Sequence, residues 1–274
     1  MGASSLSPSL ASSLSYASLP GVWHADELAG GSTQTIATGH ARLDAELPGG
    51  GWPLGAMTEL LQPMADGAVW SLLLPALAAH WQASGEAAVL VRPPHEPFIP
   101  ALSAAGLPAR AVLWVRAETA TAALWAAEQA LRCADVGSVM AWLPSVRTAD
   151  LRRLQGAAAR RAGSLLFVLR PEGAAASASP ARVRVAVRAA GVREGAAPCL
   201  QVNILKRRGP PLATPLFLNA QGGQVQALLA AASAQDHSHD SAAERTVEST
   251  SAAVLPFAAQ RESSYALDRL AVAA

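Results

Sequence analysis

Between residues 57 and 171 the chain repeatedly alternates a short apolar run with a longer stretch of helical pattern. The apolar runs are MTELL (57–61), AAVLVRP (87–93), AVLWVRA (111–117), VGSVMAWLP (136–144) and SLLFVLRP (164–171). Continuous apolar runs are typical of strands buried on both faces, and parallel strands need a crossover between them, usually a helix. The sequence therefore predicts an α/β fold in which helices flank a mostly parallel central sheet.

The segments between these runs carry the boundary signals of helices. Helices are predicted at 67–82, 98–106, 121–134 and 148–163. In the last of these, Thr148 is the expected N-cap and Gly163 the expected stop.

The pattern changes beyond residue 180. The run ARVRVAVRA (181–189) alternates strictly, which predicts valines inside and Arg182, Arg184 and Arg188 on the exposed side of a strand. Further strand-like segments follow at 198–211 and 212–220. Together they predict antiparallel strands added to the sheet at its C-terminal side.

Composition divides the chain into three parts. Residues 1–22 are rich in Ser, Ala and Leu and are expected to be flexible, 23–219 form the α/β domain, and 220–274 are low in complexity and expected to be largely disordered. The longest apolar run, at 68–81, is too short to span a bilayer comfortably and contains Pro75. No basic residue precedes the first apolar stretch, as a secretory signal would require. A cytoplasmic protein without membrane attachment is therefore expected.

The turn between the first strand and its helix has the layout of a phosphate-binding loop. It consists of Gln62, Pro63, Met64, Ala65, Asp66 and Gly67. A working loop supplies backbone N–H groups, a lysine for the terminal phosphates and a hydroxyl for Mg²⁺. Here Ala68 and Val69 stand at the lysine and hydroxyl positions, and Gln62 replaces the first glycine. Asp66 would repel phosphate, so only Gly67 keeps the turn.

The acids that such a site needs are also missing or displaced. The metal-holding acid should lie near Met140 or Ala141, and neither is acidic. Glu96 is near the position of a water-activating carboxylate, but the prolines of RPPHEP (92–97) change its geometry. Because each of these groups contributes orders of magnitude in rate, the chain is predicted not to be an enzyme and to use no cofactor or metal. Weak nucleotide binding through the remaining N–H groups stays open.

Two clusters of basic residues are candidate contacts. The net charge of +1 gives no general attraction to nucleic acid or membranes. Any such attraction would therefore depend on local clusters of charge. Solvated surface, a phosphate contact to DNA and a salt bridge to a protein partner all fit them. The clusters are Arg152, Arg153, Arg160 and Arg161 on the helix at 148–163, and Lys206, Arg207 and Arg208 before Gly-Pro-Pro.

Several motifs, in order along the chain, resemble one known family. The segment IATGHARLDAELPGGGWPLGAMTELLQP (36–63) resembles the lead-in of the RecA-type ATPase core, and LQVNILKRRGPP (200–211) resembles its terminal strand. The combination of TGHARLD, LPGGGWPLG, WAAEQALRC, LRRLQGAAARR and LKRRGPP is similar to ImuA, a family of RecA-like accessory proteins encoded with damage-inducible mutagenic polymerases. The resemblance covers roughly residues 33–219.

The resemblance implies a RecA-like fold and a role in translesion DNA synthesis during the SOS response. Its implied partners are ImuB, an inactive relative of the Y-family polymerases, and an error-prone replicative-type polymerase, with RecA and DNA as further candidates. In the RecA fold a basic pair before Gly-Pro-Pro reaches a neighbouring subunit; Arg207 matches one member and Leu205 replaces the other. The alternatives are a SulA-like cell-division inhibitor, whose group also resembles a degenerate RecA core, and a DNA-binding RecA-like ATPase, against which Ala68 argues.

Overall fold

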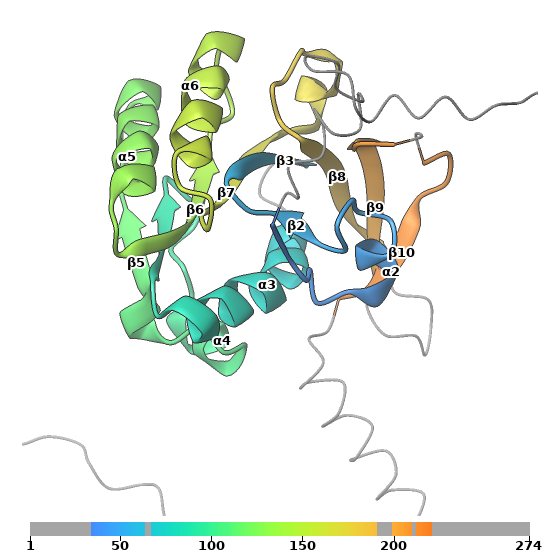
Figure 1. Cartoon of the computed structure of the whole chain (residues 1–274), viewed down its shortest axis with the longest axis horizontal. Helices are drawn as coiled ribbons and strands as arrows, with labels where there is room; N and C mark the ends of the chain where they lie inside the picture. Colours follow the sequence, from blue (N-terminus) through green and yellow to red (C-terminus); the bar gives the residue numbers. More distant parts are fainter. Residues whose placement is uncertain (1–33, 64–66, 191–198, 210–211, 221–274) are drawn as a thin grey trace, which may run out of the picture. The chain divides into compact units, whose positions relative to one another are not determined.

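The apolar runs form the centre of one large sheet in the computed structural model, which describes residues 34–63, 67–190, 199–209 and 212–220 (Figure 1). In those residues the sheet has eight strands in the order β10-β9-β8-β3-β7-β6-β4-β5. The strands from β8 to β5 pair in parallel, whereas β9 pairs antiparallel with β8 and β10. The predicted α/β fold with antiparallel C-terminal strands is therefore confirmed. The strands are β3 (Ala56–Gln62), β4 (Ala87–Val91), β5 (Val112–Val115), β6 (Val136–Trp142), β7 (Leu165–Pro171), β8 (Val183–Ala190), β9 (Cys199–Lys206) and β10 (Leu216–Asn219).

Helices cover both faces of the sheet. On one face α3 packs Leu72, Leu73 and Leu77 against side chains such as Met140 and Phe167. On the other face α5 and α6 lie side by side over the alternate residues of the same strands (Figure 1). The helices are α2 (Ala41–Asp44), α3 (Ala68–Ser84), α4 (Ile99–Ala104), α5 (Ala120–Arg132) and α6 (Thr148–Ala159), with the 3-10 turns η1 (Ala109–Ala111) and η2 (Glu172–Ala176); β1 (Thr35–Ile36) and β2 (Trp52–Pro53) form a separate small sheet.

The two ends of the chain lie largely outside the described residues. The described part falls within one compact unit, Met1–Val225, and the second unit, Gln226–Ala274, is not described. The predictions of a flexible segment at 1–22 and a disordered tail at 220–274 therefore concern residues beyond the described ones, apart from Ala220.

The predicted ends of the helix at 148–163 are wrong. The N-cap is Arg147, and Thr148 is the first helical residue, with its hydroxyl donating to the carbonyl oxygen of Ala178 at 3.3 Å. The helix ends at Ala159, four residues before Gly163. Tertiary contacts outweigh the local signals here, because Thr148 joins the neighbouring loop rather than capping its own helix.

A buried group of three charges joins the three middle strands. Glu59 of β3 is fully buried and accepts from Arg170 Nη1 of β7 at 2.7 Å and from Arg184 Nε of β8 at 2.6 Å. Arg184 also donates to the carbonyl oxygens of Ala174 and Ala175, which holds η2 against the sheet. The expectation that Arg184 lies on the exposed side is therefore wrong: its side chain is 10% exposed. The alternation of residues along one strand cannot show that a buried carboxylate on the neighbouring strand, here Glu59, binds the arginine.

The TGHARLD segment (38–44) is held against α3. Pro75 has no N–H to donate to the carbonyl of Ser71 four residues earlier. His40 Nε2 lies 3.3 Å from that carbonyl oxygen, and because a carbonyl only accepts, Nε2 is the protonated ring nitrogen. Gly39 has a φ of 84°, and an added Cβ would lie 2.3 Å from the Pro75 Cβ. Asp44 completes the segment by accepting from the Thr38 N–H at 2.7 Å.

The glycine cluster before β2 gives a first prediction. A Cβ at Gly51 would lie 2.1 Å from the carbonyl oxygen of Ile36, whereas one at Gly156 in α6 would meet nothing within 4 Å. Gly51→Ala is expected to lower the free energy of unfolding by about 1–3 kcal/mol, because backbone cannot move aside as a side chain can. The control, Gly156→Ala, is expected to raise it by about 1 kcal/mol through helix propensity. Denaturant unfolding of both variants measures this, and equal effects would contradict it.

The buried charges give a second prediction. Glu59→Gln leaves Arg170 and Arg184 buried without their anion, so the free energy of unfolding is expected to fall by about 3–5 kcal/mol. Asp150→Asn, which breaks an exposed pair with Arg147, is the control and should cost less than about 1 kcal/mol. Chemical denaturation compares the two variants with the parent chain. A Glu59→Gln variant as stable as the control would show that the three charges do not hold the strands.

His40 gives a third prediction, on pH. Burial lowers the pKa of His40 from its ordinary 6.5, against the opposing effects of the Ser71 carbonyl and Asp44. The unfolded chain then binds a proton more readily than the folded chain, so this contribution to stability is present above pH 6.5 and is lost as the pH falls below it. In His40→Gln the loss of stability between about pH 7.5 and about pH 5.5 should be smaller than in the parent chain. Urea unfolding at both pH values tests this, and an unchanged difference would contradict it.

Candidate functional site

The loop that resembles a phosphate cradle leads directly into the core. Gln62 ends β3 and Gly67 precedes α3, while Met64, Ala65 and Asp66 lie outside the described residues. Ala68 and Val69 begin α3 with exposed fractions of 7% and 1%, and both pack in the core on that face of the sheet. The positions at which a phosphate site needs a lysine and a hydroxyl therefore hold buried apolar side chains.

The strand ends beside this loop are also apolar. Met140 and Ala141 are buried within β6, which ends at Trp142 rather than at a carboxylate. Glu96 is exposed on the loop that follows β4. Among the residues that the structure describes, no three His, Cys, Asp or Glu side chains gather as a metal site would require.

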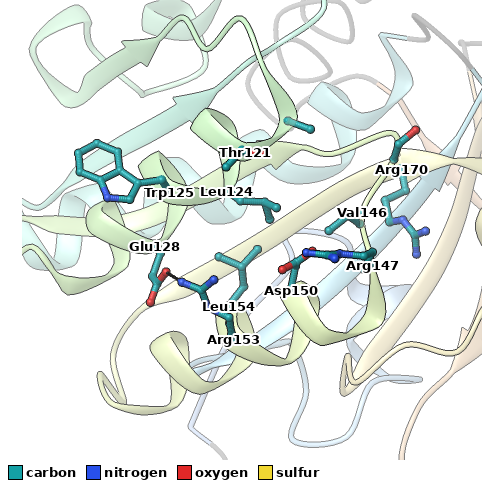
Figure 2. A pocket seen from close by; sticks show the side chains of 12 residues that line it. Thr121, Leu124, Trp125, Glu128, Val146, Arg147, Asp150, Arg153, Leu154 and Arg170 are labelled. Atoms are coloured by element: carbon teal, nitrogen blue, oxygen red, sulfur yellow. Dashed lines mark hydrogen bonds and ion pairs between the residues drawn. The ribbon is translucent and has the colours of Figure 1, made fainter.

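A groove of about 660 Å³ lies between α5 and α6 (Figure 2). We call it the α5–α6 groove. Helix α5 contributes Leu124, Trp125 and Glu128, and α6 contributes Asp150 and Arg153. Helix α5 buries an apolar stripe that includes Ala123, Ala127 and Leu131 against the sheet, which leaves Leu124 and Trp125 at the groove. Further lining residues are Ala120, Thr121, Ser145, Val146, Arg147, Leu154 and Arg170.

The groove combines an exposed aromatic ring with paired charges. The side chain of Trp125 is an exposed large apolar group, with 64% of the residue accessible. Glu128 accepts from Arg132 at 2.5 Å and from Arg153 at 2.6 Å, so it links the two helices. Arg147 pairs with Asp150 at 3.1 Å at the start of α6. The groove therefore offers both apolar surface and paired charges.

The four arginines predicted as one basic face are divided among different roles. Arg153 lies in the α5–α6 groove, whereas Arg161 donates to the carbonyl oxygens of Cys133, Ala134 and Val136 and pairs with Glu86 at 2.5 Å. Arg161 therefore fastens the turn between α5 and β6. Arg152 and Arg160 are exposed.

The second basic cluster lies at the end of β9. Lys206 donates to the carbonyl oxygen of Ser179 at 3.1 Å. Arg207 pairs with Glu46 at 2.6 Å within the same chain, with 12% of its side chain exposed. Arg208 is exposed. The position that serves a neighbouring subunit in the resembled fold is thus occupied by an internal ion pair, and contact with DNA stays a prediction.

Sequence reasoning did not single out Trp125 or the groove. Trp125 lies two residues after Ala123, about 200° around the helix from the buried stripe of α5. A large aromatic residue outside the apolar stripe was the available signal. The pairing of α5 with α6, which makes the groove, is a tertiary arrangement that no local pattern contains.

Comparison with known proteins places the chain in a family. No protein-family model matches the chain. Within the described residues, no helix is both long and apolar enough to cross a bilayer. The cell division inhibitor SulA of Edwardsiella piscicida is 34% identical over 118 residues, which is 43% of this chain and 70% of that relative. With this identity over more than two thirds of the relative, the chain belongs to the SulA family.

Proposed function

We propose that the chain is a non-catalytic, RecA-like accessory protein of the SOS response that works by contact with a protein partner. The observation that carries this proposal is the burial of Ala68 and Val69 at the positions of the lysine and the hydroxyl. Without those groups the loop supplies neither a charge for the phosphates nor a ligand for Mg²⁺. The fold is then available as a scaffold for binding surfaces.

The partner that we propose is an ImuB-type relative of the Y-family polymerases, through which the chain acts with an error-prone replicative-type polymerase. The motifs that support this extend from 36 to 211, a longer stretch than the 118 residues that match SulA. An adaptor needs a surface rather than an active site. The α5–α6 groove supplies one with apolar, acidic and basic groups side by side.

Trp125 is the proposed anchor of this contact. Tryptophan and arginine dominate the binding energy of protein interfaces, most of all where a ring enters a pocket of the partner. Trp125 has this exposure, and Arg147 and Arg153 flank the groove with side chains that are 86% and 68% exposed. These arginines form ion pairs with Asp150 and Glu128, so the groove carries both positive and negative charge. Such a surface complements a binding segment of mixed charge.

A second candidate function is inhibition of cell division. It is favoured by the 34% identity to a protein named as a cell division inhibitor. This function also works by contact and requires no hydrolysis. The two candidates therefore share the scaffold and differ in the partner.

The fourth prediction tests the contact. Trp125→Ala is expected to raise the dissociation constant for the ImuB-type partner about 30-fold, the effect of losing about 2 kcal/mol at an interface anchor. Phe98→Ala is the matched control, because Phe98 is 70% exposed and does not line the α5–α6 groove. Titration of the full-length chain against the purified partner measures both variants. Equal weakening by the two variants, or none by Trp125→Ala, would overturn the assignment of the groove.

The same variants separate the two functions in cells. For an adaptor, Trp125→Ala lowers damage-induced mutagenesis and leaves cell length unchanged when the chain is overproduced. If the chain is a division inhibitor, overproduction of the parent chain makes the cells grow into long filaments, and overproduction of Trp125→Ala does not. ATP turnover by the purified chain that is lost when Gly67 and Ala68 are changed would contradict both, since neither uses hydrolysis.

A further inference from the structure

The α5–α6 groove carries both signs of charge, but the two signs are not equally accessible. The side chains of Glu128 and Asp150 are 11% and 14% exposed, whereas those of their partners Arg153 and Arg147 are 68% and 86% exposed. Each carboxylate therefore lies low in the groove and holds an arginine that remains open to solvent. The charge that an incoming segment meets is positive.

The lining of the groove as a whole has the same sign. Three arginines but only two acids line it. Arg170, the arginine that is buried, shares Glu59 with Arg184, so two arginines and one glutamate leave that group positive as well. Helices α5 and α6 follow the parallel strands β5 and β6 and therefore begin at the same end of the groove, where their N-terminal partial charges are positive. The groove attracts acidic side chains.

Apolar side chains separate the two charged pairs. The pairs lie at opposite ends of the groove, and Leu124 and Leu154 lie between them (Figure 2). Leu154 is buried and Leu124 half-buried, and Trp125 stands beside them on α5 with 64% of the residue exposed. A segment that fills the groove therefore needs apolar side chains in its middle and carboxylates toward both ends.

The spacing of the two exposed arginines matches a helix. Arg147 and Arg153 are six positions apart along α6 and its N-cap, which places them about 9 Å apart along the axis. Residues i and i+7 of an incoming helix lie on one face about 10.5 Å apart, with i+3 and i+4 between them. Same-face residues of a strand are about 6.8 or about 13.6 Å apart, and neither distance fits as well.

We propose that the α5–α6 groove binds an acidic amphipathic helix of the protein partner. Its apolar side chains at i+3 and i+4 pack on Leu124, Leu154 and Trp125, and its carboxylates at i and i+7 accept from Arg147 and Arg153. Each guanidinium then bridges an acid of the groove and an acid of the partner, which its five N–H donors permit. This inference rests on the proposed function, in which the groove is the contact surface, and it adds the chemistry of the bound segment.

Designed peptides of about 15 residues test this chemistry on the full-length chain. The first is alanine-based with Glu at i and i+7 and Leu at i+3 and i+4, the second has Lys in place of both Glu, and the third is the first with Pro at i+5. Fluorescence anisotropy of the labelled peptides measures binding. The glutamate peptide is expected to bind saturably and at least about tenfold more tightly than the other two.

Each alternative result removes a stated part of the proposal. Equal binding of the lysine peptide overturns the preference for acidic residues, and equal binding of the proline peptide overturns the helix. A glutamate peptide that shows no saturable binding overturns the proposal as a whole.

Arg153→Gln and Arg152→Gln form a matched pair of variants. Both remove one positive charge from neighbouring positions of α6, but only Arg153 lines the groove. The fold keeps Glu128 paired in Arg153→Gln, because Arg132 binds it at 2.5 Å. Arg153→Gln is expected to weaken binding of the glutamate peptide about fivefold, and Arg152→Gln is expected to leave it unchanged. Equal weakening by the two variants shows a general charge attraction and overturns the proposal.

A failure of this inference is distinguishable from a failure of the proposed function. The peptides contain no sequence of the ImuB-type partner, so they report what the groove accepts, whereas Trp125→Ala titrated against that partner reports whether the groove is the contact. If Trp125→Ala weakens partner binding and the glutamate peptide does not bind, only the inference fails. If the glutamate peptide binds and partner binding is insensitive to Trp125→Ala, the proposed function fails and the groove takes an acidic helix of another protein.

Discussion

The ion pairs of Glu59 with Arg170 and Arg184 are the interaction on which the rest of the structure depends. Glu59 lies on β3, the strand between β7 and β8, and its two partners lie on those neighbours. A carboxylate at 0% exposure is stable only if it is fully paired, so the three strands must meet in one register. Arg184 extends the constraint to η2 through its bonds to Ala174 and Ala175. Arg170 extends it to the α5–α6 groove, which it lines.

Arg170 connects the framework to the α5–α6 groove. The residue is 8% exposed and lines that groove. Its guanidinium is held by Glu59 through Nη1, while Nε remains without a partner among the described residues. One buried side chain thus stabilises the sheet and supports the wall of the groove. Its low exposure strengthens the ion pair with Glu59, since charges interact more strongly away from water.

Local patterns predicted the elements well where burial is uniform. The runs at 57–61, 136–144 and 164–171 became β3, β6 and β7, because continuous apolar side chains suit a strand covered on both faces. Prediction failed at Arg184 and Thr148. Both side chains form their bonds with residues distant in the chain, and alternation or capping rules consider only neighbours. The basic face predicted for the helix at 148–163 divided for the same reason. Arg153 of α6 pairs with Glu128 of α5, and Arg161, which lies beyond the end of α6, pairs with Glu86.

The sequence by itself determined that this chain folds as an α/β domain and that Ala68 and Val69 stand where a phosphate loop needs a lysine and a hydroxyl. Both follow from residue type and order, which fix hydrophobic periodicity and the presence or absence of a chemical group. Only the tertiary structure decided which arginines are buried with Glu59 and which line a surface. It also brought Trp125 and Glu128 of α5 beside Asp150 and Arg153 of α6 in one groove. That groove exists because both helices pack on the same face of the sheet, an arrangement that no local pattern contains.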